Sequence, residues 1–407
     1  MTRIALRKLL PLFFALMPMA TMAQGNDDET MRHADQVFTF MLQDQIDSLY
    51  DVLADDMRHM VTKKQLRGGM KQAEQLVGTY HHHGEWTVNH QDSLTICSST
   101  CFFENGKLSV LMAFDDAWKL HGLQMMPVYD ETKDEPLPEG VVELTDTVRA
   151  ADGLALPCII TLSGLSDNPP IVVLVHGSGA VDRDETVLAN KPFRDLAHLL
   201  ASRGISTLRY DKRTFVSQKP VASVEEETID DALAAVALAR TYNSNVYLLG
   251  HSLGAMLAPI IATKTPLKGI VMMAAPARDM ESVVIDQVET LSAPDATEEQ
   301  KRQAVEDMHR QIPYYFVPQH QVQTACRLKM PMLVLQGERD YQVTMKDFSI
   351  WQKKLGKKKH ATLISYPQLN HLFIAGEGPA SPQEYMKKGC VSEQVADDIA
   401  TFVNNNR

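Results

Sequence analysis

A serine between two glycines is the feature of this 407-residue sequence that points most clearly to chemistry. Residues 250–254 read Gly-His-Ser-Leu-Gly and follow the apolar run Val246–Leu249, which is typical of a buried parallel strand. A helix-prone run, Ala255–Thr263, comes next. The pattern predicts a sharp strand-to-helix turn that exposes the Ser252 hydroxyl for attack on a carbonyl carbon. The alternative is an ordinary strand-turn-helix segment with an unreactive serine.

A serine hydroxyl needs a general base, and the base needs a carboxylate that orients it. Asp340 lies soon after the apolar strand predicted at Pro331–Leu335, and His371 lies soon after the strand predicted at Ala361–Tyr366. In an open parallel sheet, ligands bind at the loops beyond the carboxyl ends of the strands. We therefore predict that Ser252 is the nucleophile, His371 the general base and Asp340 the residue that orients it.

Neighbouring side chains compete for the acid and base roles. Glu338 lies two residues before Asp340, and His360 lies in a lysine-rich run that precedes the last predicted strand. We favour Asp340 because it lies one loop beyond a strand end and falls between Ser252 and His371 in the chain. Otherwise Asp340 would be an ordinary solvent-exposed acid in a turn.

A second glycine-rich segment could stabilise the oxyanion that forms during attack. His176-Gly-Ser-Gly follows the strand predicted at Ile171–Val175, and its glycines allow backbone N–H groups to turn toward that charge. Leu253 begins the helix after Ser252, and helix N-termini favour negative charge. We predict that the backbone N–H groups of Ser178 and Leu253 form the oxyanion hole, and that His176 is not the base.

These residues belong to an alternation of strands and helices that predicts an α/β fold with a mostly parallel sheet flanked by helices. An antiparallel hairpin, Val141–Val148 and Leu154–Leu162, is expected to precede it. The predicted strands are Ile171–Val175, Ile205–Tyr210, Val246–Leu249, Gly269–Ala274, Pro331–Leu335 and Ala361–Tyr366. The predicted helices are Phe193–Ser202, Ile229–Thr241, Ala255–Thr263, Met345–Leu355 and Ser392–Val403.

An insertion at about residues 277–328 interrupts this alternation. Arg278–Ser292 and Thr297–Ile312 have helical periodicity and are followed by Pro-Tyr-Tyr-Phe. We expect a helical cap over the carboxyl edge of the sheet, where it would shape the substrate pocket. A plain surface excursion is the alternative.

Residues 26–126 differ in pattern and predict a small α+β domain. Helical periodicity over Asp28–Met60 and Lys63–Thr79 predicts two helices, and alternating runs after Trp86 predict antiparallel strands with Asn105-Gly106 as a hairpin turn. The charged, proline-containing stretch 127–140 predicts a linker to the α/β part, residues 141–407.

Two residue clusters invite other interpretations. The histidines at 81–83 and His90 suggest a metal site, but three adjacent histidines cannot all face one ion, and no acid or cysteine lies at a ligand spacing. We expect no metal. Cys97 and Cys101 could form a disulfide across a turn or remain buried thiols, and the sequence leaves both possibilities open.

Charge and the N-terminus limit location and partners. The formal net charge is -11, so there is no electrostatic reason to bind nucleic acid or an anionic membrane. Residues 1–23 combine a basic start, an apolar run and small residues that end at Ala23. This predicts a signal peptide cleaved near Ala23, hence a secreted or periplasmic protein. A retained membrane anchor is less compatible with the short apolar run.

The motifs together resemble the α/β-hydrolase superfamily, over roughly residues 141–407. They are His176-Gly-Ser-Gly, Gly250-His-Ser-Leu-Gly, Gly337-Glu-Arg-Asp and Asn370-His371. The longer stretches His176-Gly-Ser-Gly-Ala-Val-Asp-Arg-Asp-Glu185 and Arg209-Tyr-Asp-Lys-Arg213 resemble secreted two-domain bacterial carboxylesterases with a small N-terminal α+β domain. In that group a glycine usually follows Asp-Lys-Arg, whereas this chain has Thr214.

The resemblance implies Ser252 as nucleophile, His371 as base and Asp340 as its partner, with hydrolysis of short-chain, small-molecule carboxylic esters and no cofactor. The same constellation serves several bonds, so a serine peptidase of the same superfamily is an alternative. A protein that binds a glycan or a partner on an inactive hydrolase scaffold is a second alternative, which a complete set of three residues at three strand ends disfavours.

Overall fold

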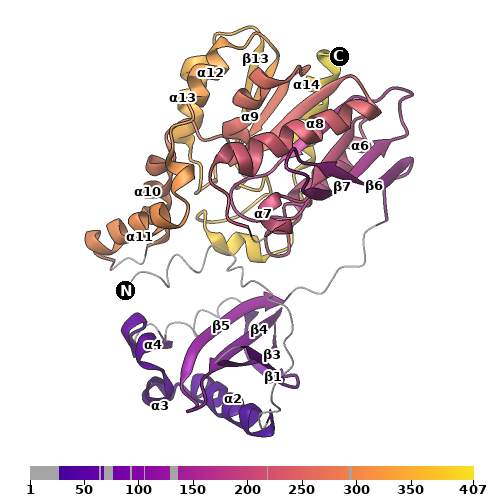
Figure 1. Ribbon diagram of the computed structural model, residues 1–407. Helices are drawn as coiled ribbons and strands as arrows, with labels where there is room; N and C mark the ends of the chain where they lie inside the picture. Colours follow the sequence, from indigo (N-terminus) through magenta and orange to yellow (C-terminus); the bar gives the residue numbers. More distant parts are fainter. Residues whose placement is uncertain are drawn as a thin grey trace. The chain divides into compact units, whose positions relative to one another are not determined.

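The computed structural model describes residues 27–63, 66–67, 77–91, 94–104, 106–128, 136–217, 219–292 and 296–407. The chain forms two compact units (Figure 1): the N-terminal unit comprises residues 1–134 and 296–300, and the C-terminal unit comprises residues 135–295 and 301–407. The predicted signal peptide, most of the helix predicted at Lys63–Thr79, and Asn105 lie outside the described residues. Among the helices of the described ranges, none is both long enough and apolar enough to span a membrane.

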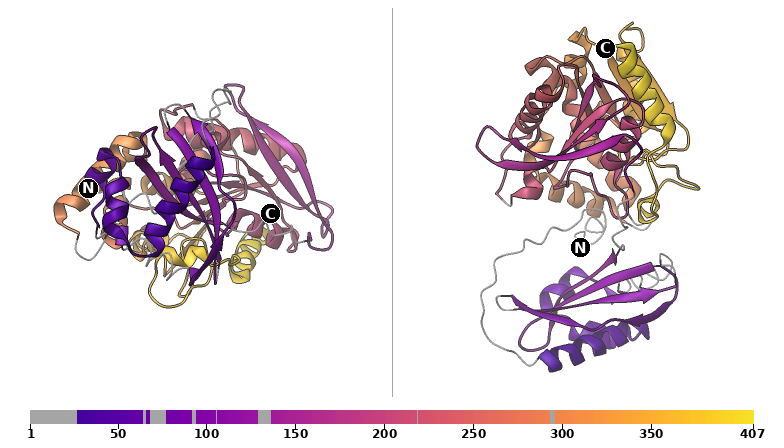
Figure 2. Two further views of the ribbon diagram at one scale, coloured as in Figure 1. Left: turned by 90° about the horizontal axis from the view of Figure 1, so that it is seen from below. Right: turned by 90° about the vertical axis from the view of Figure 1, so that its right-hand side faces the viewer.

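The N-terminal unit packs helices on one face of a curved antiparallel sheet, as predicted (Figure 2). The sheet order is β1-β3-β4-β5, and β2 pairs with β3. The elements are α2 (Asp27–Leu42), α3 (Ile46–Val52), α4 (Asp55–Met60), β1 (Tyr80–His83), β2 (Thr87–Gln91), β3 (Leu94–Phe103), β4 (Gly106–Phe114) and β5 (Leu120–Val128).

Two details of this unit differ from the prediction. One helix was expected over Asp28–Met60, but the helix breaks at Asp44, whose φ is 54°, and again at the extended Leu53. Three short helices can follow the curved sheet, whereas the apolar periodicity alone does not reveal the breaks. The strand β5 also extends to Val128, two residues into the range predicted as a linker.

Cys97 and Cys101 are free thiols that lie on the same face of β3. Four residues of extended strand separate their Cα atoms by about 13 Å, far beyond the roughly 7 Å that a disulfide can bridge. Burial raises the pKa of each thiol to about 12. The two cysteines therefore act as small apolar core residues.

The C-terminal unit contains an eight-stranded sheet with the order β13-β12-β11-β10-β8-β9-β7-β6. The strands β8 to β13 are parallel to one another. At one edge, β7 pairs antiparallel with β9, and β6 pairs antiparallel with β7. The strands are β6 (Val141–Arg149), β7 (Ala155–Ser163), β8 (Ile171–Val175), β9 (Ser206–Tyr210), β10 (Val246–His251), β11 (Ile270–Met273), β12 (Met332–Gly337) and β13 (Ala361–Tyr366). The predicted fold class is confirmed.

Helices cover both faces of this sheet because successive strand residues face opposite sides. In β8, Val172 and Leu174 pack in one core with α6 and α14, whereas Val173 and Val175 pack in the other with α8, α9 and α13 (Figures 1 and 2). The helices are α6 (Pro192–Ala201), α7 (Arg213–Val216), α8 (Asp230–Tyr242) after the π-helical turn η1 (Glu225–Ile229), α9 (Leu253–Lys264), α13 (Met345–Leu355) and α14 (Glu393–Asn405).

The predicted insertion is helical. It contains α10 (Met280–Leu291), α11 (Glu298–Gln311), the 3-10 turn η2 (Pro313–Phe316) and α12 (Gln321–Arg327), of which α12 was not predicted. Val283 and Val284 of α10 are buried, whereas Ile285 is 43% exposed. The insertion reaches the carboxyl end of β8, because the Gly179 N–H donates a hydrogen bond to the Tyr315 hydroxyl at 3.0 Å.

Candidate active site

Ser252 lies in a strained turn between β10 and α9. Its φ of 52° and ψ of −115° place it in a backbone conformation that residues other than glycine rarely adopt. A Cβ at Gly250 would lie 2.2 Å from the Gly254 carbonyl oxygen, and a Cβ at Gly254 would lie 2.2 Å from the Val175 carbonyl oxygen. Only glycine fits both positions, so this turn has the geometry of a nucleophile elbow.

Asp340 and His371, which the sequence placed in separate loops, form a buried hydrogen-bonded pair. His371 Nδ1 donates to Asp340 Oδ2 at 2.6 Å. The other carboxylate oxygen accepts the backbone N–H groups of Gln342 at 2.8 Å and Val343 at 2.9 Å. These bonds fix the carboxylate and leave His371 Nε2 as the basic nitrogen.

The competing residues lie elsewhere. Glu338 is exposed and accepts a hydrogen bond from Ser365. His360 precedes β13, and its carbonyl oxygen accepts the Met332 N–H at the amino end of β12, so it lies at the opposite edge of the parallel strands. His176 is buried, and burial lowers its pKa to about 4. A neutral, enclosed imidazole of this kind is a core residue. It lies next to residues 177–179, the predicted oxyanion-hole segment, called the oxyanion segment below.

His251, which precedes Ser252, connects the elbow to the loop that carries His371. Its Nε2 donates to the His371 carbonyl oxygen at 2.9 Å, and its Nδ1 lies 3.1 Å from Glu185 Oε1. Glu185 Oε1 also accepts the Gly177 N–H at 2.7 Å. The segment after β8, the elbow and the histidine loop therefore meet at one buried charge pair.

The charge state of this pair follows from its contacts. Burial disfavours the charged form of His251, but the adjacent Glu185 carboxylate and the His371 carbonyl raise the pKa of His251 overall. Burial acts against the Glu185 carboxylate too, but His251, His176 and the Gly177 N–H lower its pKa overall. Each member of the pair thus favours the charged form of the other.

The oxyanion segment lies against the elbow. A Cβ on Gly177 would lie 3.3 Å from the Ser252 Cβ, so only a glycine lets the backbone approach this closely without displacing it. The Gly177 and Gly179 N–H groups bond to Glu185 and Tyr315, whereas within the described residues the Ser178 N–H has no partner. Leu253 is the first residue of α9, where N–H groups lack intrahelical acceptors.

Several solved structures are similar to this chain. An esterase domain from a Rhodothermus marinus protein is 17% identical, covers 65% of this chain and 98% of its own, and has a TM-score of 0.42. The Pyrococcus furiosus esterase Pf2001 is 14% identical, with coverage of 65% and 91% and a TM-score of 0.47. A Mycobacterium tuberculosis puromycin-hydrolyzing peptidase is 15% identical, with coverage of 80% and 48% and a TM-score of 0.45.

Family models match two parts of the sequence. Residues 34–123 match a protein of unknown function, DUF3887, and residues 223–388 match the prolyl oligopeptidase family. The esterase EstD of Thermotoga maritima is 40% identical over 336 residues, which cover 77% of this chain and 80% of EstD. The chain belongs to the EstD family. Its C-terminal unit has the α/β-hydrolase fold, and because 77% exceeds the share of residues 141–407, the similarity to EstD extends into the N-terminal unit.

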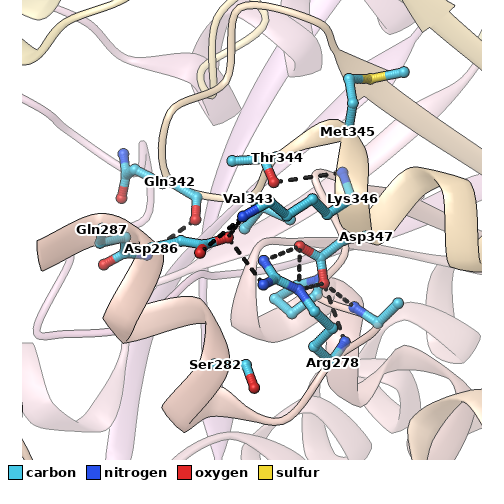
Figure 3. A network of polar contacts seen from close by, with 12 residues as sticks. Arg278, Ser282, Asp286, Gln287, Gln342, Val343, Thr344, Met345, Lys346 and Asp347 are labelled. Atoms are coloured by element: carbon cyan, nitrogen blue, oxygen red, sulfur yellow. Dashed lines mark hydrogen bonds and ion pairs between the residues drawn. The ribbon is translucent and has the colours of Figure 1, made fainter. Parts of the chain in front are cut away.

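In this EstD family member, polar contacts tie the insertion to the loop that carries the acid (Figure 3). Arg278 at the start of the insertion donates to Asp347 at 2.8 Å and pairs with Asp286 of α10 at 2.9 Å. Gln287 of α10 donates to the Gln342 carbonyl oxygen at 3.2 Å. The peptide that holds Asp340 is therefore anchored to α10.

Sequence reasoning missed these supporting residues. His251 and Glu185 lie 66 positions apart, and Arg278 and Asp347 lie 69 apart. Glu185 carries one signal, because it falls inside the motif that begins at His176, but that motif does not reveal the partner. No periodicity links Arg278 to Asp347, so their pairing becomes visible only in the fold.

Proposed function

We propose that this chain is a serine carboxylesterase that cleaves small-molecule esters through an acyl-enzyme. The observation that carries the proposal is the 2.6 Å bond between His371 and Asp340, in a loop that His251 ties to the strained Ser252 elbow. The EstD family supports ester hydrolysis. No step in the proposed reaction requires a cofactor.

In the proposed reaction, His371 Nε2 accepts the Ser252 hydroxyl proton while Ser252 Oγ bonds to the ester carbonyl carbon. The carbonyl π electrons move to its oxygen, which accepts hydrogen bonds from the Ser178 and Leu253 N–H groups. As the oxyanion collapses, the bond to the alkoxy oxygen breaks and His371 returns the proton to the leaving alcohol. Water then attacks the acyl carbon and gives a proton to His371; as this second oxyanion collapses, the bond to Ser252 Oγ breaks, His371 returns the proton to Oγ, and the acid is released.

We extend the proposal to substrate size and location. A preference for short acyl chains is supported by the resemblance to two-domain carboxylesterases. Secretion or transfer to the periplasm, with cleavage near Ala23, is supported by the basic and apolar pattern of residues 1–23.

A serine peptidase is the second candidate, because residues 223–388 match the prolyl oligopeptidase family. The same triad can cleave amides as well as esters. The two candidates differ in the bond cleaved, so one assay with both substrate types separates them.

The test compares p-nitrophenyl esters of increasing acyl length with an aminoacyl p-nitroanilide. We expect wild type to hydrolyse the short esters fastest and Ser252→Ala to lose this turnover by about a million-fold, as removal of a serine nucleophile does elsewhere. Ser349→Ala, at an exposed position on α13, is the matched control and should keep wild-type rates. Full activity in folded Ser252→Ala would refute the proposal, and anilide cleavage without ester preference would favour the peptidase.

A further inference from the structure

A closed set of buried polar contacts surrounds the oxyanion segment. Lys212 Nζ donates to the Gly177 carbonyl oxygen at 2.7 Å and lies 2.9 Å from Glu227 Oε1. The same Glu227 oxygen accepts the Tyr315 hydroxyl at 2.7 Å, and that hydroxyl accepts the Gly179 N–H at 3.0 Å. The contacts begin and end on the residues that flank Ser178.

Three distant elements supply these side chains. Lys212 follows β9, Glu227 lies in η1 before α8, and Tyr315 lies in η2 of the insertion. The Lys212 and Glu227 side chains are only 2% and 1% exposed. Lysine and glutamate are almost never buried so completely unless they are paired, and removal from water is costly even then. A buried ion pair of this kind contributes little net stability, so stability alone does not explain why Lys212 and Glu227 are here.

The ion pair of Lys212 and Glu227 fixes the direction of the Gly177–Ser178 peptide. In a planar trans peptide, the carbonyl oxygen and the next N–H point in opposite directions. Lys212 holds the Gly177 carbonyl, so the Ser178 N–H of the same peptide must point away from Lys212. The positive charge also polarises this peptide and strengthens its N–H as a donor. Gly177 lies against Ser252, where the oxyanion would form.

We propose that Lys212 is a positioning residue of the oxyanion hole, and that Glu227 and Tyr315 hold it there and connect it to the insertion. Lys212 acts through the Gly177–Ser178 peptide and does not contact the substrate. This proposal rests on the proposed serine hydrolase function, because only a reaction with an oxyanion needs the Ser178 donor. In the part of the chain that the structure describes, Lys212, Glu227 and Tyr315 have no hydrogen bond to His371 or Asp340.

The first test is the double variant Lys212→Met/Glu227→Gln, which removes both charges and leaves no unpaired buried carboxylate. A missing oxyanion donor costs about a hundredfold to a thousandfold in kcat, so a donor that is present but misdirected should cost about 10–100-fold. We expect kcat to fall by that factor with KM changed less than about twofold, and the inhibition constant of a trifluoromethyl ketone, which forms a tetrahedral oxyanion, to rise in parallel.

A milder variant covers the case in which the double variant does not fold. Tyr315→Phe removes one hydroxyl and should lower kcat about 3–10-fold, with the same parallel rise in the inhibition constant. Tyr247→Phe is the matched control, because its buried hydroxyl donates to the Val403 carbonyl oxygen at the far end of β10. This control should lose stability without changing kcat or inhibitor affinity.

Folded variants that keep both kcat and inhibitor affinity within about twofold of wild type would overturn the inference. Labelling of Ser252 by a fluorophosphonate separates the two proposals, because it needs an activated serine and an oxyanion hole but no ester. Wild type that does not label contradicts the proposed function itself. Equal labelling rates in wild type, the double variant and Tyr315→Phe contradict only the role of Lys212.

Discussion

The two sides of Ser252 are held by different means. On the acid–base side, His371 and Asp340 lie in short loops directly after β13 and β12, and neighbouring backbone N–H groups fix the Asp340 carboxylate. On the oxyanion side, the segment after β8 is fixed by two buried charged side chains, Glu185 eight residues after Gly177 and Lys212 after β9. The first arrangement follows from local sequence, whereas the second requires the complete fold.

Because of this difference, we expect substitutions on the two sides of Ser252 to affect stability and turnover in different proportions. Changes on the acid–base side should reduce chemistry strongly while leaving stability nearly intact, because the backbone bonds persist. Changes on the oxyanion side should reduce stability and chemistry together, since each removes a buried charge that also positions the backbone.

The largest expected effect is from Asp340→Asn. The amide can keep the backbone hydrogen bonds of one oxygen but favours the wrong tautomer of His371, so kcat should fall about 10³–10⁴-fold with little change in Tm. Steady-state kinetics and thermal unfolding check this. Glu338→Gln is the matched control at the exposed competitor and should change kcat less than about twofold. A larger loss in Glu338→Gln than in Asp340→Asn would reverse the assignment.

Glu185→Gln tests the oxyanion side through pH. The pKa of His251 is raised from its ordinary value of 6.5, so its contribution to stability is complete below that value and is lost as pH rises through the folded pKa. The pKa of Glu185 is lowered from 4.5, so its contribution is complete above that value and is lost as pH falls through the folded pKa.

The difference in Tm between wild type and Glu185→Gln should therefore be greatest between about pH 4.5 and 6.5 and should shrink on both sides. Thermal unfolding across that range measures it. We also expect kcat to fall about tenfold, because a neutral amide oxygen accepts the Gly177 N–H more weakly than the carboxylate does and no longer pairs with a charged His251. A Tm difference that does not vary with pH would show that the pair is not charged in the folded protein.

Arg278→Met should have the smallest effect on chemistry. It removes contacts to Asp347 and Asp286, of which the Asp347 side chain is fully buried, so the free energy of unfolding should drop by about 3 kcal/mol. Because the N–H groups of Gln342 and Val343 still hold Asp340, kcat should change less than about threefold. Chemical denaturation and kinetics test this, and a loss comparable to that of Asp340→Asn would mean that α10 itself positions the acid.

Features that depend on one continuous stretch of sequence could be predicted, whereas features that depend on contacts between distant residues could not. Strand β10, the elbow and α9 were predictable because one apolar run, two glycines and a helical run lie within a single stretch of chain. The three helices α2 to α4 were predicted as one because the apolar spacing continues across the break at Asp44, whose positive φ the pattern does not reveal. Cys97 and Cys101 seemed able to pair because the sequence did not show that both lie in one extended strand.

The supporting residues of the site were beyond sequence reasoning for a physical reason. Lys212 lies in a recognised stretch, Arg209–Arg213, but that stretch does not reveal that its ammonium group reaches back to the Gly177 carbonyl. The role of a buried charge depends on the groups that it contacts. The contacts of Lys212 include Glu227 in a π-helical turn, and Glu227 in turn binds Tyr315 of the insertion. The sequence therefore provided candidates for the reacting residues but no indication of the side chains that hold them in place.

The central claim is that Ser252 forms an acyl-enzyme. The most direct measurement is the pre-steady-state release of p-nitrophenol from p-nitrophenyl acetate by a known concentration of folded protein, under conditions in which deacylation is slower than acylation. The account predicts a burst close to one equivalent per chain in wild type and none in Ser252→Ala. A burst of the same size in Ser252→Ala, or ester turnover in that variant at the wild-type rate, would contradict it.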